Sequence, residues 1–306
     1  MVAPPLTDRA TTHSTAVLGA TVRYWDYSPA DPSRSYPTIV MVHGFRGDHH
    51  GLLKIVAAMD QARIIVPDLP GFGASEPLAQ THNVANYSRC VRLLIEQLQL
   101  PDEVMLLGHS FGSVIASHAA SASGRPPASL VLINPICEPA LEGSKAFLSR
   151  VTSLYYRLCA SLPERAGMFL LRSRVIVRVM SELMAHTKDR RLRRWIHAEH
   201  QRYFSAFANR QVVLESFQAS ITGTVRDVAD QLDMPVLLIA AEDDDLGSVA
   251  GQRRLAGAIS NSRLEILTGV GHLIHYEKPR EAAGLMMEFL EAAQDGGQAA
   301  QDGGPP

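Results

Sequence analysis

A single serine stands where an apolar run gives way to a run of small residues. Residues 104–107 read Val-Met-Leu-Leu, which is typical of a buried strand, and residues 113–117 read Ser-Val-Ile-Ala-Ser, as the first turns of a helix do. Between them Gly108 and Gly112 flank Ser110 in a G-x-S-x-G pattern. Glycine suits both positions because no Cβ fits where a strand and a helix approach so closely. We therefore expect a strand, a tight turn and a helix, with the Ser110 hydroxyl beside helix N-terminal N–H groups that favour negative charge.

Further apolar runs alternate with helical patterns along the chain. Strands are predicted over residues 38–42, 63–66, 129–133, 235–240 and 264–267, and a hairpin at a sheet edge over 15–27. Helices are predicted over residues 52–60, 86–98, 255–259 and 282–293. This alternation indicates an α/β fold with a mostly parallel sheet, and a ligand site beyond the carboxyl ends of the strands.

Composition excludes several broad classes of protein. A chain of 306 residues, 46% apolar and with a formal net charge of −2, can bury one large α/β domain and lacks the basic surplus of a nucleic-acid-binding protein. The first residues have no apolar run typical of a secretion signal, and no run approaches the ~20 residues that a membrane span needs. Cys90, Cys137 and Cys159 show no paired spacing, so we expect free thiols in the reducing cytoplasm.

One stretch differs in kind from the rest of the chain. Residues 138–228 lack strand alternation and contain helical runs, for example over 172–184 and 191–207. From residue 140 to residue 228 there are 15 Lys and Arg against 7 Asp and Glu, a surplus of 8, so the remainder of the chain carries a net −10. The sequence therefore predicts a basic helical insertion in an acidic sheet domain.

These patterns predict four segments. They are an N-terminal extension, 1–14, an α/β core made of 15–137 and 229–294, the helical insertion, 138–228, and a tail, 295–306. The tail consists mainly of Gly, Gln, Ala and Pro and has nothing to bury, so we expect it to be disordered.

His272 is the histidine best placed to act with Ser110. A serine hydroxyl needs a general base to act as a nucleophile at neutral pH, usually a histidine whose other ring nitrogen is oriented by a carboxylate. His272 follows the glycine-containing residues 268–271 directly after the last predicted strand, so this loop would carry its ring over the strand ends. Residues 242–245 are four consecutive acids after the preceding strand, and they leave the identity of the acid open.

Two backbone amides are candidates for stabilising an oxyanion. The Phe111 N–H directly follows Ser110, and the Phe45 N–H lies in the loop after the strand predicted over 38–42. Removing one preorganised donor of this kind typically slows acyl transfer ~100- to 1000-fold. His43, in the same loop as Phe45, is expected to shape that loop by hydrogen bonding rather than to react.

Two other motifs are interpreted as structural. His49 and His50 resemble a metal-binding pair, but adjacent side chains are expected to face apart, and no third ligand is spaced to join them. Residues 68–73, Asp-Leu-Pro-Gly-Phe-Gly, lack the lysine and the full glycine pattern of a phosphate-binding loop. We therefore predict no metal site and no cofactor.

Four segments together resemble the α/β-hydrolase family over residues 17–293. They are His43-Gly44-Phe45, Asp68-Leu69-Pro70-Gly71-Phe72-Gly73-Ala74-Ser75, Gly108-His109-Ser110-Phe111-Gly112 and Gly271-His272. The order of serine, acid and histidine is also that family's order. In the family the acid usually ends a G-x-x-D segment, which residues 241–244, Ala-Glu-Asp-Asp, match with alanine for glycine. The resemblance thus implies Ser110, Asp244 and His272 as catalytic residues, with Asp243 as the alternative to Asp244.

The resemblance also implies a fold and an activity. The fold is a mostly parallel sheet flanked by helices, with 138–228 as its inserted helical cap. The activity is that of a serine hydrolase cleaving a carboxylic ester or thioester through an acyl-Ser110 intermediate. No aspartate replaces Ser110, which disfavours epoxide hydrolases and haloalkane dehalogenases. The loop after Gly44 lacks the second glycine-rich element of proline iminopeptidases and hormone-sensitive-lipase-like esterases.

Two other functions and the choice of partners stay open at this point. One alternative is hydrolysis of a carbon–carbon bond in a vinylogous diketone, and the other is ligand binding without turnover on the same scaffold. The expected partner is a small-molecule acyl substrate and not a nucleic acid. The arginines of the cap would either contact an anionic membrane or an acyl carrier such as coenzyme A, or form a solvated face. These arginines are Arg190, Arg191, Arg193, Arg194 and Arg202. The sequence does not determine the oligomeric state.

Overall fold

A single eight-stranded sheet forms the centre of the molecule. The computed structural model describes residues 5–31, 36–101, 103–122, 124–139 and 146–302. The strand order across the sheet is β1-β2-β4-β3-β5-β6-β7-β8. The strands are β1 (Ala10–Val17), β2 (Ala20–Tyr27), β3 (Thr38–Val42), β4 (Arg63–Pro67), β5 (Val104–His109), β6 (Ser129–Ile133), β7 (Val236–Ala241) and β8 (Ser262–Leu267).

The pairing directions confirm the mostly parallel α/β sheet. From β4 through β8 every neighbouring pair is parallel, whereas β2 runs antiparallel to both β1 and β4. β1 and β2 form the hairpin predicted at the sheet edge. Because the parallel strands share one direction, the loops that follow β3, β5, β6, β7 and β8 all leave the same edge of the sheet.

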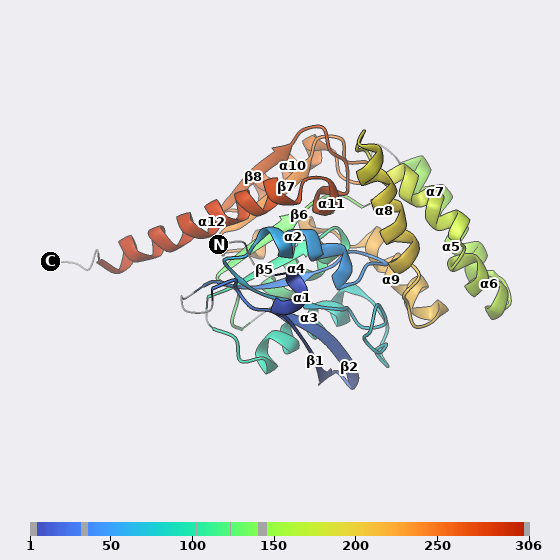
Figure 1. Cartoon of the computed structure of the whole chain (residues 1–306), viewed down its shortest axis with the longest axis horizontal. Helices are drawn as coiled ribbons and strands as arrows, with labels where there is room; N and C mark the ends of the chain where they lie inside the picture. Colours follow the sequence, from blue (N-terminus) through green and yellow to red (C-terminus); the bar gives the residue numbers. More distant parts are fainter. Residues whose placement is uncertain (1–4, 32–35, 102, 123, 140–145, 303–306) are drawn as a thin grey trace.

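Helices cover both faces of the sheet (Figure 1). In β3, Val40 and Val42 pack into one apolar core while Ile39 and Met41 pack into the other, so the strand is buried on both sides. The first core includes side chains of α3 (Val84–Gln97), α4 (Phe111–Ser121) and α10 (Val249–Ala258). The second core includes side chains of α2 (Leu53–Ala58), α11 (Ile274–Glu277) and α12 (Pro279–Asp302). Three short elements complete the core domain: α1 (Leu6–Arg9), η1 (His49–Leu52) and η2 (Val225–Gln231).

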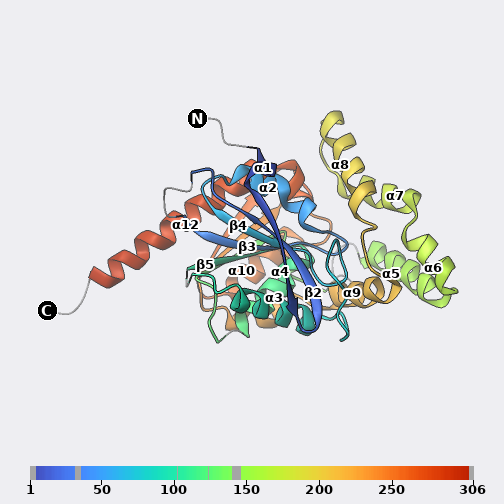
Figure 2. The ribbon, with the colours of Figure 1, turned by 60° about the horizontal axis from the view of Figure 1, so that its bottom comes forward.

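Between β6 and β7 the described residues form helices and no strand. In both views these helices lie together at one side of the sheet domain, away from the C-terminal end of α12 (Figures 1 and 2). They are α5 (Ala146–Ser161), α6 (Glu164–Leu171), α7 (Arg174–Met184), α8 (Arg190–Tyr203) and α9 (Arg210–Thr222). We call α5 to α9 the cap helices. None of the helices within the described ranges combines the length and apolarity needed to cross a bilayer.

Several boundaries differ from the sequence prediction; α10, for example, begins at Val249 and not at 255. β1 begins at Ala10, five residues before the predicted hairpin, because residues along its whole length pair with β2. A helix predicted over 172–184 begins only at Arg174, after α6 has ended, and the helix predicted over 191–207 ends at Tyr203. The last helix, α12, continues to Asp302 rather than ending before a disordered tail from 295, since an existing helix gains one hydrogen bond per added residue. Residues 303–306 of that tail lie outside the described residues.

Candidate active site

Ser110 occupies a strained turn between β5 and α4. Its φ of 54° lies in the left-handed region that residues other than glycine rarely adopt. A Cβ on Gly108 would collide with the backbone of Gly112, and one on Gly112 would collide with the Val42 carbonyl of β3. The two glycines therefore allow α4 to begin directly over the sheet, with Ser110 at the apex. Strain of this kind is concentrated at functional sites.

His272 and Asp244 reach Ser110 from the ends of two other strands. His272 lies in the loop after β8, and its Nε2 is 2.7 Å from the Ser110 Oγ. Asp244 lies in the loop after β7, and both its carboxylate oxygens are 3.0 Å from the His272 Nδ1. The His272 ring and the Asp244 carboxylate are both buried, with side-chain exposures of 4% and 1%. The structure thus brings the three residues into one hydrogen-bonded row.

Of the two acids considered for this row, Asp244 is the one that contacts His272. Asp243 donates its backbone N–H to the Val270 carbonyl, and this pairing ties the loop after β7 to the loop that carries His272. Burial alone would raise the pKa of Asp244, but His272 and hydrogen bonds from Leu246 and Asn134 outweigh it, so the pKa lies below its usual value. Asp244 is therefore held as a carboxylate at neutral pH.

Asn134 is a residue of the site that the sequence analysis did not identify. It directly follows β6, has a φ of 46°, and donates from its side-chain amide to Asp244 Oδ2 at 2.6 Å. Since β6 lies between β5 and β7, Asn134 is placed between the serine and the acid. Its position in the sequence could have identified it. Asn134 directly follows a buried strand, and the neighbouring strand in the sheet is followed by the loop that carries Asp244.

The loop after β3 passes directly beside the serine. A Cβ on Gly44 would lie 3.1 Å from the Ser110 Cβ, so glycine lets the segment that carries the Phe45 amide lie this close to the serine without displacing it. Phe111 is the first residue of α4, and its N–H is one of the groups that a helix leaves without an internal partner. Both predicted oxyanion donors therefore belong to segments that adjoin Ser110.

His43 behaves as a structural residue of this loop. Its Nε2 accepts from the Leu69 N–H at 2.9 Å, which leaves the proton on Nδ1 to be donated to the Gly44 carbonyl, also at 2.9 Å. Burial lowers the pKa of His43, so the neutral ring that makes these two bonds is favoured. This agrees with the loop-shaping role expected from the sequence.

Ser110 and His272 line two cavities. The larger, of about 210 Å³, extends under the cap helices, and apolar side chains dominate its walls. These include Phe45, Ile136, Tyr156, Met180, Leu183 and Phe217. The smaller, of about 50 Å³, is lined by the imidazoles of His43, His109 and His275. Within the described residues the buried His275 Nδ1 has no hydrogen-bond partner.

Arg46 is a second residue whose role the sequence did not suggest. It follows Phe45, is 1% exposed, and has a φ of 59°. Its guanidinium donates to the Tyr156 hydroxyl of α5 and to two carbonyls at helix ends, Leu171 at 2.7 Å and Phe204 at 3.0 Å. The negative ends of two helix dipoles thus surround this buried charge. Arg46 links the loop beside Ser110 to three cap helices.

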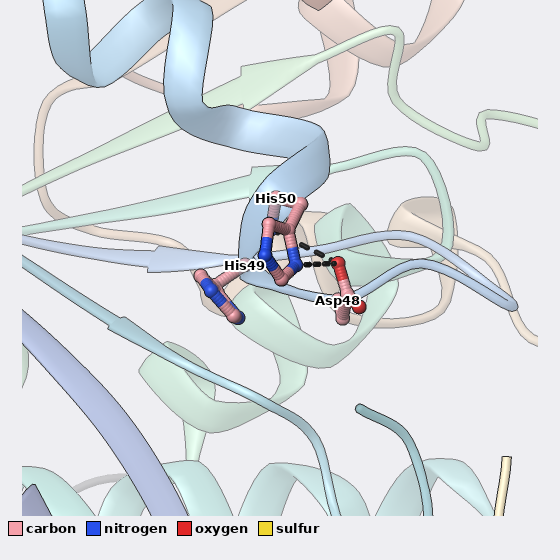
Figure 3. A group of neighbouring side chains, drawn as sticks. All are labelled: Asp48, His49 and His50. Atoms are coloured by element: carbon pink, nitrogen blue, oxygen red, sulfur yellow. Dashed lines mark hydrogen bonds and ion pairs between the residues drawn. The ribbon is translucent and has the colours of Figure 1, made fainter. Parts of the chain in front are cut away.

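Asp48, His49 and His50 form the group among the described residues whose ligand atoms could reach one metal ion, within 4.8 Å of one another (Figure 3). The expectation that the adjacent rings face apart is wrong, because their centroids are 3.8 Å apart. The cause is a pair of carboxylates: Asp48 accepts from both the backbone and the ring of His50, and Asp68 does the same for His49. These bonds occupy the Nδ1 atom of each ring, so any ion would have to be bound through Nε2.

A model of the Alpha/beta hydrolase family matches residues 39–285. The chain belongs to this family. Monoacylglycerol lipase ABHD6 of Mus musculus is 24% identical over 298 residues, which cover 91% of this chain and 84% of the lipase. Lipase LipV of Mycobacterium tuberculosis is 35% identical over 121 residues, or 39% of this chain and 42% of LipV.

Solved structures share the fold. A thermophilic esterase from Thermogutta terrifontis matches 93% of this chain and 99% of its own with a TM-score of 0.74 at 19% identity. An enol-lactonase from Burkholderia xenovorans matches 91% of this chain and all of its own with a TM-score of 0.73, also at 19% identity. Membership of this family, with lipases among the relatives, supports a hydrolase.

Proposed function

We propose that the protein is a serine hydrolase that cleaves a carboxylic ester or thioester through an acyl-Ser110 intermediate. The observation that carries the proposal is the hydrogen-bonded row from Ser110 through His272 to Asp244. Ser110 and His272 line a cavity with apolar walls. A nucleophile, a base and an orienting carboxylate in this contact are what acyl transfer requires. The lipase names of the relatives favour an ester as the substrate.

The reaction proceeds in two halves. Ser110 Oγ attacks the acyl carbonyl while its proton passes to His272 Nε2, and Asp244 holds the proton of Nδ1 so that Nε2 is free to accept. The Phe45 and Phe111 N–H groups donate to the oxyanion. His272 then protonates the leaving alcohol or thiol as the bond to it breaks. Water attacks the acyl-serine in the second half, giving its proton to His272, which returns a proton to Ser110 Oγ as the acid leaves.

The two cavities suit the two parts of an ester. The larger cavity, with walls such as Ile136, Met180 and Phe217, accommodates an apolar acyl chain. The smaller cavity beside His109 and His275 has room for roughly three or four water-sized groups, the size of a small hydroxylated alcohol. We therefore assign the acyl chain to the first cavity and a small polar leaving group to the second.

The test is hydrolysis of p-nitrophenyl esters from acetyl to palmitoyl. We expect turnover with an optimum of chain length in the wild-type enzyme, and a loss of at least ~1000-fold in Ser110→Ala with unchanged thermal unfolding. Ser117→Ala is the matched control, because Ser117 lies on the same helix and donates only to the Val114 carbonyl. Ester hydrolysis retained in Ser110→Ala would refute the acyl-serine mechanism, and failure of wild-type Ser110 to react with a fluorophosphonate would refute its nucleophilic role.

A further inference from the structure

The cap helices expose large apolar side chains on their outer side. On α5 the exposed residues include Val151, Leu154 and Leu158, at spacings of three and four that place them on one helix face. On α7, Val175, Val179 and Leu183 recur every four residues and also share a face. Leu154 is 67% exposed and Val175 is 73% exposed. Single exposed apolar residues are ordinary, but clusters of them on one helix face, as on both of these cap helices, are typical of an interaction surface.

These two faces flank the acyl cavity. Thr152 of α5 and Met180 of α7 line that cavity, and each is adjacent in sequence to an exposed apolar residue of its helix, Val151 and Val179. Leu183 both lines the cavity and is half-exposed. In both ribbon views α5, α6 and α7 form the side of the molecule farthest from the sheet (Figures 1 and 2). The exposed apolar residues therefore lie on two helices that also supply part of the wall of the acyl cavity, and not on a remote part of the chain.

Arginines border the apolar surface. Four of them, with His197, line a surface hollow between α7 and α8; they are Arg178, Arg190, Arg193 and Arg194. Glu182 pairs with Arg178 and Arg193. In the part of the chain that the structure describes, no carboxylate pairs with Arg190, Arg191 or Arg194. The surface thus offers unpaired positive charge beside exposed apolar side chains.

We propose that this surface, made of the outer faces of α5 and α7 and the arginines of α8, docks the enzyme on an anionic phospholipid bilayer. Apolar side chains such as Leu154 and Val175 would enter the acyl boundary, and the arginines would bind lipid phosphates and carboxylates. Charge decides against a second copy of this chain as the occupant, since the segment from 140 to 228 carries a surplus of 8 positive charges and two such surfaces repel.

Docking in this orientation would bring α5 and α7, which line the acyl cavity through Thr152 and Met180, against the lipid. An acyl chain would then have a short path from the bilayer to the cavity beside Ser110. This consequence for the substrate, an ester held in a membrane, rests on the proposed function. The docking itself does not, and it is measured in a protein that cannot turn over.

The first experiment is sedimentation of full-length Ser110→Ala with vesicles of phosphatidylcholine alone or with 30% phosphatidylserine. We expect strong binding only to the anionic vesicles, weakening as salt rises. Adding Leu154→Asp and Val175→Asp should reduce the fraction bound at least tenfold. Replacing Arg190, Arg191 and Arg194 by Gln should weaken binding about fivefold per charge removed.

Matched variants separate docking from general changes of charge. Arg89, Arg253 and Arg280 are exposed on the core domain, so their replacement by Gln removes the same charge and should leave vesicle binding nearly unchanged. Gln218→Glu adds a negative charge at an exposed position of α9, a helix outside the proposed surface. Thermal unfolding of each variant confirms that it is folded. Equal binding to neutral and anionic vesicles, or no binding to either, would overturn the proposal.

Two further outcomes distinguish this inference from others. If sedimentation velocity shows a dimer that Val175→Asp dissociates, the apolar surface is a contact between two copies and the docking proposal is wrong. If the wild-type enzyme binds anionic vesicles yet hydrolyses no ester, docking stands and the proposed function fails. If the docking and the proposed function both hold, Leu154→Asp should lower activity on esters in anionic vesicles while keeping kcat/KM for a soluble short ester.

Discussion

At the scale of single residues, the chemistry of the site depends on which acid orients His272. Asp244 accepts from His272 Nδ1, whereas the neighbouring Asp243 contributes a backbone bond to Val270. If the proposed mechanism holds, Asp244→Asn removes the acceptor that fixes the imidazole tautomer, and kcat should fall about 10⁴-fold with little change in KM. Asp243→Asn is the matched control and should alter kcat less than about threefold, a difference smaller than any catalytic role would produce. Steady-state kinetics on one p-nitrophenyl ester measures both.

The opposite kinetic result would assign the orienting role to Asp243 instead of Asp244. A large loss of kcat in Asp243→Asn together with near-normal turnover in Asp244→Asn would mean that the loop after β7 rearranges in solution. The low pKa of Asp244 adds a second check. A carboxylate whose folded pKa lies below its unfolded value stabilises the protein above the unfolded pKa, and this stability is lost as the pH falls through the folded pKa. Asp244→Asn should therefore reduce stability at pH 7 more than at pH 3.

At the scale of the elements, Arg46 holds the cap helices to the loop beside Ser110. Arg46→Met leaves buried acceptors on Leu171, Phe204 and Tyr156 without their donor, and each such group costs about 1–3 kcal/mol. We expect the free energy of unfolding in urea to fall by about 3 kcal/mol or more. Arg172→Met is the control, because Arg172 also lies over the Phe207 ring but is exposed and donates a single bond.

Partial recovery would identify the cause of that loss. Arg46→Lys keeps the charge but cannot reach three acceptors with a planar fork, so its stability should lie between wild type and Arg46→Met. Proteolysis within the cap should also become faster in Arg46→Met, since the cap helices would detach before the core unfolds. An unchanged unfolding midpoint in Arg46→Met would show that the cap is held by apolar packing alone.

The elements also show how far a sequence predicts such a fold. Buried central strands are continuous apolar runs, so β3 and β6 coincide with their predicted ranges, 38–42 and 129–133. Ser110 and His272 were found because glycines mark the turns that carry them. The first residues of β1 are exposed and polar, and they form a strand only because β2 pairs with them. Arginine is a residue type usually found at the surface. The burial of Arg46 depends on carbonyls more than a hundred residues away in the sequence, which no local pattern indicates.

At the scale of the whole molecule, buried histidines should make the protein sensitive to acid. Burial and neighbouring histidine charge lower the pKa of His109 to about 3, and the same causes lower that of His200 to about 3. The pKa of His275 is also lowered, by burial and by nearby histidines including His109, His200 and His272. Unfolded histidine binds a proton near pH 6.5, so below that pH the unfolded chain binds protons that the folded protein does not. Stability must therefore fall as the pH falls.

The expected size of this effect makes it measurable. Between pH 6.5 and 5.5 each such histidine should remove about 1 kcal/mol from the free energy of unfolding, or roughly 3 kcal/mol for the three together. Carboxylates with a lowered pKa, such as Asp244, change the stability only at lower pH, so they do not contribute to this window. Urea unfolding at pH 7.5, 6.5 and 5.5 gives the dependence. His275→Gln should reduce its slope by up to about a third whatever it does to stability at pH 7.5, because the pKa values of His43 and His197 are lowered as well. A slope that stays the same in His275→Gln would mean that the ring is protonated in the folded protein, and that the small cavity beside Ser110 is open to water.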